Sequence, residues 1–254
     1  GDVRGLIKVL KSADVGLSCI LACVYFLALP LTITINAAGN SFLKLLTIPI
    51  AGYFAVSWFF YRKKLELNII HLLSFLYLIT VVMTLFADRS PVSLQYVRGY
   101  FETIGLMFLI TMRKYTENEI KAFELTQLAL LGVMIVLGFT GGEWYGDRNT
   151  MTIFGATSDP NFFSGFFILP VAVALKKMRE NKIYAVICTV LTALGIYMVF
   201  SSGSRGGLFG LSVMIMSFVF INAKGAKQRF IGIGAVMITA IMLWIVVIPL
   251  LSED

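Results

Sequence analysis

The feature that most constrains this chain is a succession of long apolar segments separated by short charged ones. A helix needs about 20 apolar residues to cross the hydrocarbon core of a bilayer. Charged residues make up only 14% of the chain, against about 25% in a soluble domain, so a water-soluble fold could not bury its apolar surface. We therefore expect an all-α polytopic membrane protein, a helix bundle forming one transmembrane domain over residues 1–254. Nine segments qualify as spans: 16–35, 42–61, 67–86, 94–112, 120–139, 161–176, 183–200, 206–222 and 230–250.

The basic residues predict the orientation of this bundle. Sixteen of the 21 lie in alternate connections, at residues 4–11, 62–64, 113–121, 176–182 and 224–229. Cytoplasmic loops are enriched in Lys and Arg, so these connections are expected in the cytoplasm, with the N-terminus inside and the C-terminus outside. The net charge of +7 is clustered between apolar runs, which is typical of a membrane protein and argues against a nucleic-acid partner.

The sequence offers little for metal or hydrolase chemistry. Its three cysteines lie inside apolar runs without a C-x-x-C pair, and His71 is its only histidine. His71 is expected near the cytoplasmic start of the third span, where it is most simply a packing or interface residue. A nucleophile elbow, G-x-S-x-G, would need glycine at position 202, where Ser202 stands. No acidic cluster suited to Mg²⁺ lies in the external connections, so we expect neither metal nor cofactor.

Five basic residues fall on or toward the external side: Lys44, Arg89, Arg98, Arg148 and Arg205. Arginine is costly at a membrane, and guanidinium binds phosphate oxygens in a bidentate manner. Arg89 and Arg148 each follow an aspartate, so pairing with that acid or with lipid headgroups remains open for both. Arg98 lies within the fourth span, and Glu102 at i+4 is its expected partner.

Two short strings open external helix starts. At residues 201–207 the string S-S-G-S-R-G-G combines Arg205 with glycines, hydroxyls and the start of a helix, and free helical N–H groups favour anions. A polar turn whose glycines permit close helix packing is the alternative. Asp159 followed by Pro160 predicts an N-cap and a first helical residue. Together these strings and the four arginines predict a polyanion site at the outer membrane surface.

This arrangement resembles the O-antigen ligase and O-antigen polymerase superfamily of membrane glycosyltransferases. The resemblance is carried by the cytoplasmic N-terminus, the D-P-N string at 159–161 and the S-G-S-R-G string at 202–206. It implies a GT-C-like fold in the bacterial cytoplasmic (inner) membrane, with a multi-pass topology and an outward-facing active site. Family members carry a large external loop with a histidine base, followed by further spans. The catalytic base and those spans are accordingly expected beyond Asp254.

The resemblance also implies a reaction and its partners. An acceptor hydroxyl on a glycan, lipid or protein would displace undecaprenyl diphosphate from the anomeric carbon of a lipid-linked glycan donor, without a metal. The expected lipid-diphosphate ligands are Arg205, Arg98, Arg89 and Arg148. The residues expected to shape the site are Ser202, Gly203, Ser204, Gly206, Asp159, Asn161 and Glu102.

Polymerase and ligase activity both fit these residues. Two other functions stay open, namely a membrane transporter of an anionic or lipid-linked substrate and a non-catalytic truncated homologue. The ionisable residues gather at one face, which favours the enzyme over a transporter with a site at the bilayer midplane.

Overall fold

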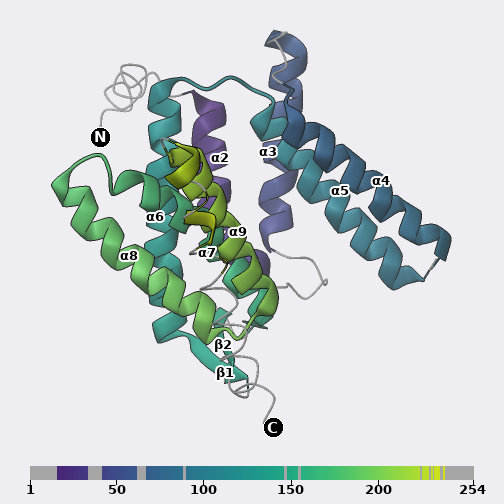
Figure 1. Ribbon diagram of the computed structural model, residues 1–254. Helices are drawn as coiled ribbons and strands as arrows, with labels where there is room; N and C mark the ends of the chain where they lie inside the picture. The colour runs from purple at the N-terminus through teal and green to yellow at the C-terminus, as the bar shows by residue number, and fades with distance from the viewer. Residues whose placement is uncertain are drawn as a thin grey trace, which may run out of the picture. The chain divides into compact units, whose positions relative to one another are not determined.

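The computed structural model describes residues 16–33, 42–61, 67–87, 90–145, 148–153, 156–223, 225–228, 230, 232–234 and 237 (Figure 1). Over these residues the chain is mostly helical, which confirms the helical class. The helices are α2 (Leu17–Leu27), α3 (Phe42–Tyr61), α4 (Ile69–Ala87), α5 (Pro91–Thr111), α6 (Glu117–Thr140), α7 (Pro160–Lys177), α8 (Lys182–Ser201) and α9 (Arg205–Asn222). A 3₁₀ helix, η1 (Leu29–Ile33), follows α2.

The helices that matter for the site begin where side chains satisfy their first backbone N–H groups. Asp159 caps α7 by accepting from the amide of Asn161, and Pro160 follows at the first helical position, as predicted. Ser204 caps α9, and Asn181 caps α8. Each cap has extended backbone before the helical turn, which fixes where the helix starts.

Three of the described helices, α6, α8 and α9, are long and apolar enough to cross a membrane. Shorter apolar helices occupy Leu17–Leu27, Leu46–Ser57 and Ile69–Met83. The first predicted span is interrupted, because α2 ends at Leu27 and η1 takes over. Most of the ninth segment, 230–250, lies outside the described residues. The nine-span topology thus stays a prediction.

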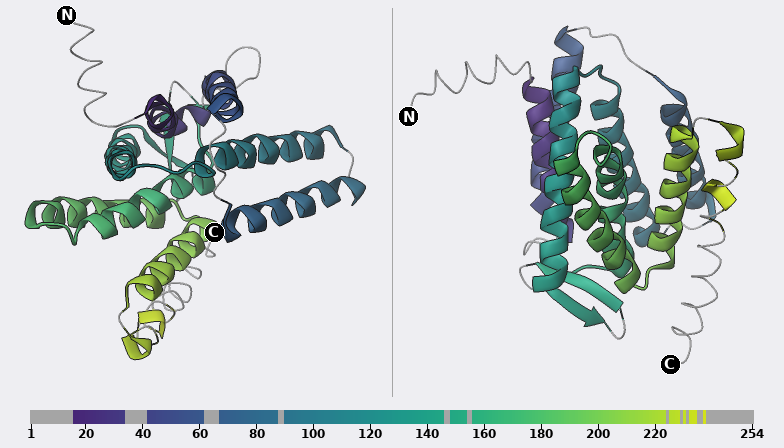
Figure 2. Two further views of the ribbon diagram at one scale, coloured as in Figure 1. Left: turned by 90° about the horizontal axis from the view of Figure 1, so that it is seen from above. Right: turned by 60° about the vertical axis from the view of Figure 1, so that its left-hand side comes forward.

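The chain divides into two compact units. Unit 1 comprises residues 1–25 and 43–122, and unit 2 comprises residues 26–42 and 123–254. Within unit 2, α7 packs against both α8 and α9 (Figures 1 and 2). The core of this unit is apolar and combines residues of α6, α7 and α8, among them Leu131, Met134, Phe163, Phe167 and Met198.

A small sheet precedes α7 in unit 2. Its strands are β1 (Gly142–Tyr145), β2 (Arg148–Ile153) and β3 (Ala156–Thr157), all antiparallel in the order β1-β2-β3. The all-α class expected from the sequence therefore holds only in part, because three short strands lie between α6 and α7. The strands are too short to display a periodic apolar pattern, and their backbone hydrogen bonds supply the order instead.

Unit 1 contains α4 and α5, which lie side by side as an antiparallel pair (Figures 1 and 2). His71 of α4 is buried and is hydrogen-bonded to the Thr111 hydroxyl at 2.9 Å, while its ring stacks on Phe108. Its other nitrogen, Nδ1, accepts from the backbone amide of Asn68. The histidine therefore has a packing role, as predicted.

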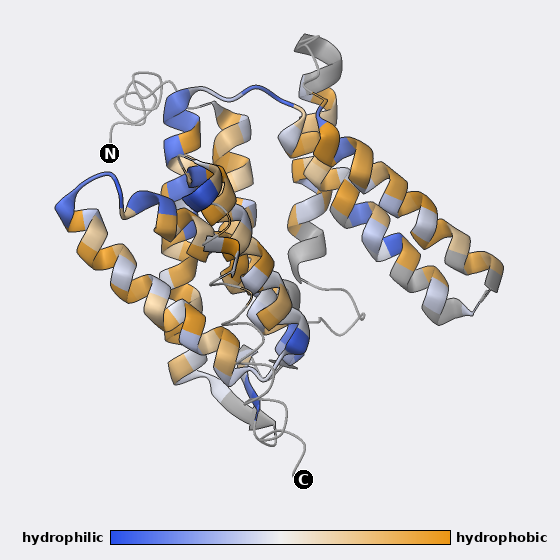
Figure 3. Cartoon of the chain, in the orientation of Figure 1, coloured by the Kyte–Doolittle hydropathy of each residue, from blue (hydrophilic) through white to orange (hydrophobic). Residues whose placement is uncertain are grey.

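In unit 2 the apolar residues lie along the helices and the hydrophilic residues lie at the turns (Figure 3). Figure 3 shows apolar residues along the length of α8 and hydrophilic residues at the turn between α7 and α8. Because α7 runs between that turn and the sheet, the polar groups of unit 2 gather toward the two ends of its helices. One end carries the turn at 201–207 and the sheet, and the other carries the lysine-rich turn at 176–182.

Candidate functional site

The turn between α8 and α9 is built around the hydroxyl of Ser204. This hydroxyl accepts from the amide of Gly207 at 2.9 Å and thereby caps α9. It also donates to Oδ1 of Asn161 at 2.7 Å. Ser204 is buried, so its bond to Gly207 is shielded from water, whereas its bond to the exposed Asn161 is only partly buried. The strings at residues 159–161 and 202–206 are thus in direct contact.

This contact brings the starts of α7 and α9 together. Asn161 receives the hydroxyl of Ser204 on its side chain, while its own amide donates to Asp159 Oδ1 at 2.7 Å. Gly206 faces the same group, since a Cβ there would lie 3.8 Å from Asn161 Oδ1. The free N–H groups at a helix start carry partial positive charge, so two such charges lie beside one another.

The seam between α7 and α9 depends on the absence of a side chain at position 207. Any Cβ at Gly207 would collide with Oγ and Cβ of Ser164. Ser164 is fully buried and its hydroxyl donates to the carbonyl of Asn161 at 2.9 Å. The glycine therefore permits the close approach that the Ser204–Asn161 hydrogen bond requires.

Gly203 provides the sharp turn before α9. Its φ of +57° lies in the left-handed region, which favours glycine. A Cβ at this position would stand only 3.0 Å from Cγ of Arg148. Arg148 of β2 thus lies directly against Gly203, and Gly203 is two residues from Arg205 in the sequence. Ser202 precedes the turn, buried, with its hydroxyl donating to the carbonyl of Val199 at 2.7 Å.

Strand β2 is hydrogen-bonded through two adjacent side chains, one to the end of α8 and one to the residue before the cap of α7. The side-chain amide of Asn149 donates to the Ser201 hydroxyl at 3.4 Å, at the end of α8. Thr150 is fully buried, and its hydroxyl lies 2.8 Å from that of Ser158, just before α7. Asn149 Oδ1 is buried and has no hydrogen-bond partner among the described residues. Arg148 therefore starts a strand that is held to both neighbouring helix ends.

The two arginines at this end of unit 2 are available to a ligand. Arg148 and Arg205 are exposed, and no described acidic residue forms an ion pair with either. Asp147, the sequence neighbour considered for Arg148, lies outside the described residues. Two guanidinium groups and two helix starts lie at this end of unit 2 with the one carboxylate of the α7 cap, Asp159, and such groups can bind a phosphate or diphosphate.

The other predicted arginines do not belong to unit 2. Arg98 lies on α5 in unit 1, where its Nε donates to Glu102 at 2.7 Å, confirming the expected i+4 pair. The Arg98 side chain remains 74% exposed. Arg89 and its neighbour Asp88 lie outside the described residues, so the role predicted for Arg89 stays a prediction.

The catalytic base has no counterpart in this site. It was expected beyond Asp254, and Asp254 itself lies outside the described residues, so the base stays a prediction. His71, the only histidine of the sequence, is buried in unit 1 and bonded on both ring nitrogens. It therefore does not take the place of that base.

At the opposite end of unit 2 the charges neutralise one another. Glu124 binds both Lys176 and Lys177, and Lys177 also donates to Glu180 at 2.8 Å. Burial by itself lowers the pKa of Lys177, but its hydrogen bonds to the two glutamates raise that pKa above its ordinary value, so the lysine stays protonated. A buried, paired ammonium has a structural role, whereas Arg148 and Arg205 form no ion pair with a described acid.

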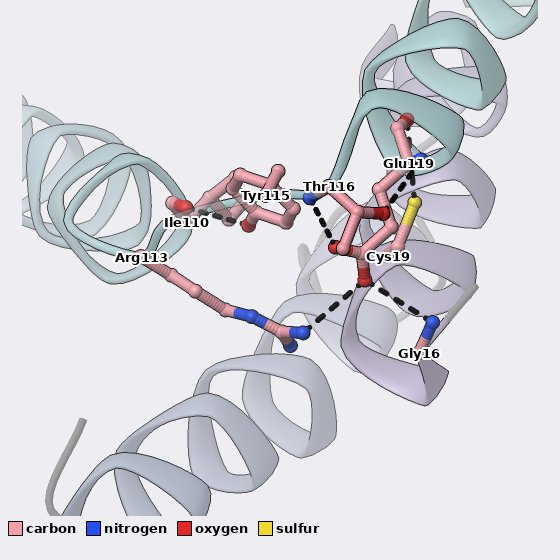
Figure 4. A network of polar contacts seen from close by, with 7 residues as sticks. All are labelled: Gly16, Cys19, Ile110, Arg113, Tyr115, Thr116 and Glu119. Carbon is pink, nitrogen blue, oxygen red and sulfur yellow. Dashed lines mark hydrogen bonds and ion pairs between the residues drawn. The ribbon is translucent and has the colours of Figure 1, made fainter. Parts of the chain in front are cut away.

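A second network, in unit 1, surrounds Glu119 (Figure 4). Glu119 and Thr116 form a capping box at the start of α6, with Thr116 donating its amide to the carboxylate at 2.9 Å. The same carboxylate accepts from Arg113 and from the amide of Gly16, each at 3.1 Å. The buried acid is satisfied by these donors, so it fixes the start of α2 rather than acting on a ligand.

Sequence reasoning missed four residues that support the site, namely Asn149, Thr150, Ser158 and Ser164. It assigned no separate role to Ser201, the first residue of the string at 201–207. One signal was present, because Ser164 and Gly207 each lie three residues after the linked pair Asn161 and Ser204, as neighbours across a helix seam would. For Asn149 and Thr150 no signal was available without the sheet. Among the described residues no group of three or more His, Cys, Asp or Glu side chains could hold a metal ion.

Comparison with known proteins adds no relative to this picture. No family model, curated protein or solved structure matches the chain. The family resemblance of the two strings consequently rests on their residues alone and belongs to the proposal that follows.

Proposed function

We propose that this protein is a membrane glycosyltransferase that transfers or polymerises a glycan from undecaprenyl diphosphate on the outer face of the cytoplasmic membrane. The observation that carries the proposal is the Ser204–Asn161 hydrogen bond, which joins the starts of α7 and α9 beside Arg148 and Arg205. A lipid-linked diphosphate is an anion that would reach such a site from the membrane surface.

The chemistry required of the site is charge stabilisation. An acceptor hydroxyl forms a bond to the anomeric carbon, the bond from that carbon to the diphosphate oxygen breaks, and the hydroxyl proton passes to a base. Negative charge develops on the departing diphosphate, and Arg205 at the start of α9 would stabilise it together with the helical N–H groups. Arg148 against Gly203 supplies a second guanidinium.

The separation of charge along unit 2 supports an outward-facing site. The paired lysines lie at one end of its helices, and Arg148 lies against the turn at the other. Within the proposed nine-span topology, the excess of basic residues at the lysine-rich end favours the cytoplasm for that end. The arginines would then face the side on which lipid-linked glycans are used.

The experiment is substitution of Arg205 in the intact protein. Arg205→Ala should abolish glycan transfer and lower the affinity for undecaprenyl diphosphate in detergent, and Arg205→Lys should restore only part of each because it cannot bind in a bidentate manner. Arg179→Ala is the matched control, since Arg179 stacks on Phe218 at the opposite end of unit 2. Glycan transfer that persists in Arg205→Ala while export of the lipid-linked substrate stops would establish a transporter instead.

A further inference from the structure

Strand β2 carries a buried polar side chain, Asn149, whose burial is not explained by the helices or by the turn at 201–207. Asn149 is only 6% exposed, although asparagine is usually a surface residue. Burial of an amide is unfavourable unless its hydrogen bonds are made, and Oδ1 of Asn149 has no partner among the described residues. The buried, unpaired amide oxygen is unfavourable for folding, so we expect Asn149 to have a compensating role.

The side-chain hydrogen bonds of Asn149 to the last turn of α8 indicate that role. Nδ2 donates to Ser201 Oγ at 3.4 Å, and Met198 Sδ lies 4.0 Å away. Ser201 in turn donates to the carbonyl of Met198 at 3.1 Å, so it is free to accept from the amide. Asn149 thus attaches β2 to the last turn of α8.

The attachment lies one residue from Arg148 on the strand and two residues from Gly203 on the helix side. It is therefore close enough to control how Arg148 packs on the turn. Arg148 itself has no ion pair with a described residue that could hold it there. Its approach to Gly203 must come from the backbone of β2, and Asn149 fixes that backbone to α8.

We propose that Asn149 is a positioning residue, which holds β2 against the end of α8 and so keeps the guanidinium of Arg148 beside the start of α9. The inference rests on the proposed function insofar as the positioned guanidinium serves a diphosphate. Asn149 is not expected to touch the ligand, because its side chain is buried. It acts through Arg148 alone.

A double-mutant cycle tests this dependence. Binding of farnesyl diphosphate to the detergent-solubilised chain is measured by titration calorimetry for the wild type, Asn149→Ala, Arg148→Ala and the double variant. Each single substitution should weaken binding about tenfold, and the double variant should bind no more weakly than Arg148→Ala. Asn222→Ala, which removes an amide at the far end of α9, should bind as the wild type does. Equal weakening by Asn149→Ala in both backgrounds would overturn the inference.

A second measurement is independent of any ligand. Nitroxide labels at Arg148→Cys and Arg205→Cys, in a background whose three native cysteines are alanine, report the distance between β2 and α9 by double electron–electron resonance. The distance distribution should be narrow in the labelled parent, which retains Asn149, and equally narrow in the control variant Asn222→Ala. It should be broad in Asn149→Ala. An unchanged distribution in Asn149→Ala overturns the inference.

The two measurements separate the two proposals. Failure of farnesyl diphosphate to bind the wild type, or binding unaffected by Arg205→Ala, would count against the proposed function. In that event the label distances decide the positioning inference by themselves, because broadening supports it and an unchanged distribution refutes it.

Discussion

The hydroxyl of Ser204 makes two hydrogen bonds that serve different purposes. By accepting from Gly207 it starts α9, and by donating to Asn161 it ties α9 to α7. A single oxygen atom thus contributes both to a helix and to its packing. Removing this hydroxyl leaves the partly buried acceptor of Asn161 and the buried N–H group of Gly207 without their partner, which costs free energy.

We predict that Ser204→Ala lowers the free energy of unfolding by about 1–3 kcal/mol. Ser212→Ala is the matched control, because the Ser212 hydroxyl donates only within α9, to the carbonyl of Leu208. That substitution should cost less than about 0.5 kcal/mol. Denaturant titration of both variants in detergent makes the comparison, and equal losses would contradict the role assigned to Ser204.

Two neighbouring lysines bind the same carboxylate in different surroundings. The side chain of Lys177 is 5% exposed and that of Lys176 is 60% exposed, although both bind Glu124. Lys177→Met should reduce the free energy of unfolding by roughly 3 kcal/mol, since it leaves acids at a buried site with one partner fewer. Lys176→Met should cost less than about 1 kcal/mol, because water screens an exposed ion pair. The same denaturant titration distinguishes them, and a larger loss for Lys176→Met would show that burial is not the controlling factor.

At the scale of elements, the site depends on how closely α7 and α9 approach. Ser164 and Gly207 set that distance, and the linked helix starts follow from it. The sheet then brings Arg148 to the same place from a separate part of the chain. A helix seam and a short strand thus combine residues from three segments.

We predict opposite effects for alanine at two glycines of unit 2. Gly207→Ala should destabilise by about 2 kcal/mol because its Cβ meets Ser164. Gly165→Ala on α7 should stabilise by about 0.5–1 kcal/mol, since no described atom lies within 4 Å of its Cβ and alanine favours the helix. Adding Ser164→Gly to Gly207→Ala should recover part of the loss. Thermal unfolding measures all three, and destabilisation by Gly165→Ala would show that open space is not what separates the sites.

At the scale of the whole molecule, the proposal requires the two ends of α7 to face opposite sides of a membrane. Thr157 lies just before α7 and Glu180 just after it, and both are exposed. Single cysteines at these positions, in a background without native cysteines, should differ in their reaction with a membrane-impermeant maleimide. Thr157→Cys should react in intact cells, and Glu180→Cys only after permeabilisation. Reaction of both from the same side would exclude a membrane-spanning α7.

Features that are determined by residues close together in the sequence could be predicted. Features that depend on contacts between distant residues could not. The starts of α7 and α9 follow from local caps, Asp159 with Pro160 and Ser204, and the sequence predicted them. The bond between Asn161 and Ser204 spans 43 residues, and nothing local states which helix starts will meet. The sheet could not be predicted because its short strands are ordered only by pairing with one another. The position of Asn149 could not be predicted for the same reason.

The carboxylate of Glu119 has a consequence for the time course of synthesis. It accepts a hydrogen bond from the amide of Gly16, which the ribosome makes 103 residues earlier. At about 5–20 residues per second the amide waits on the order of 5–20 s for its acceptor. During that interval α2 has to be held by other groups, such as water, headgroups or the insertion machinery. The nascent chain therefore completes the start of α2 only when the first turn of α6 is translated.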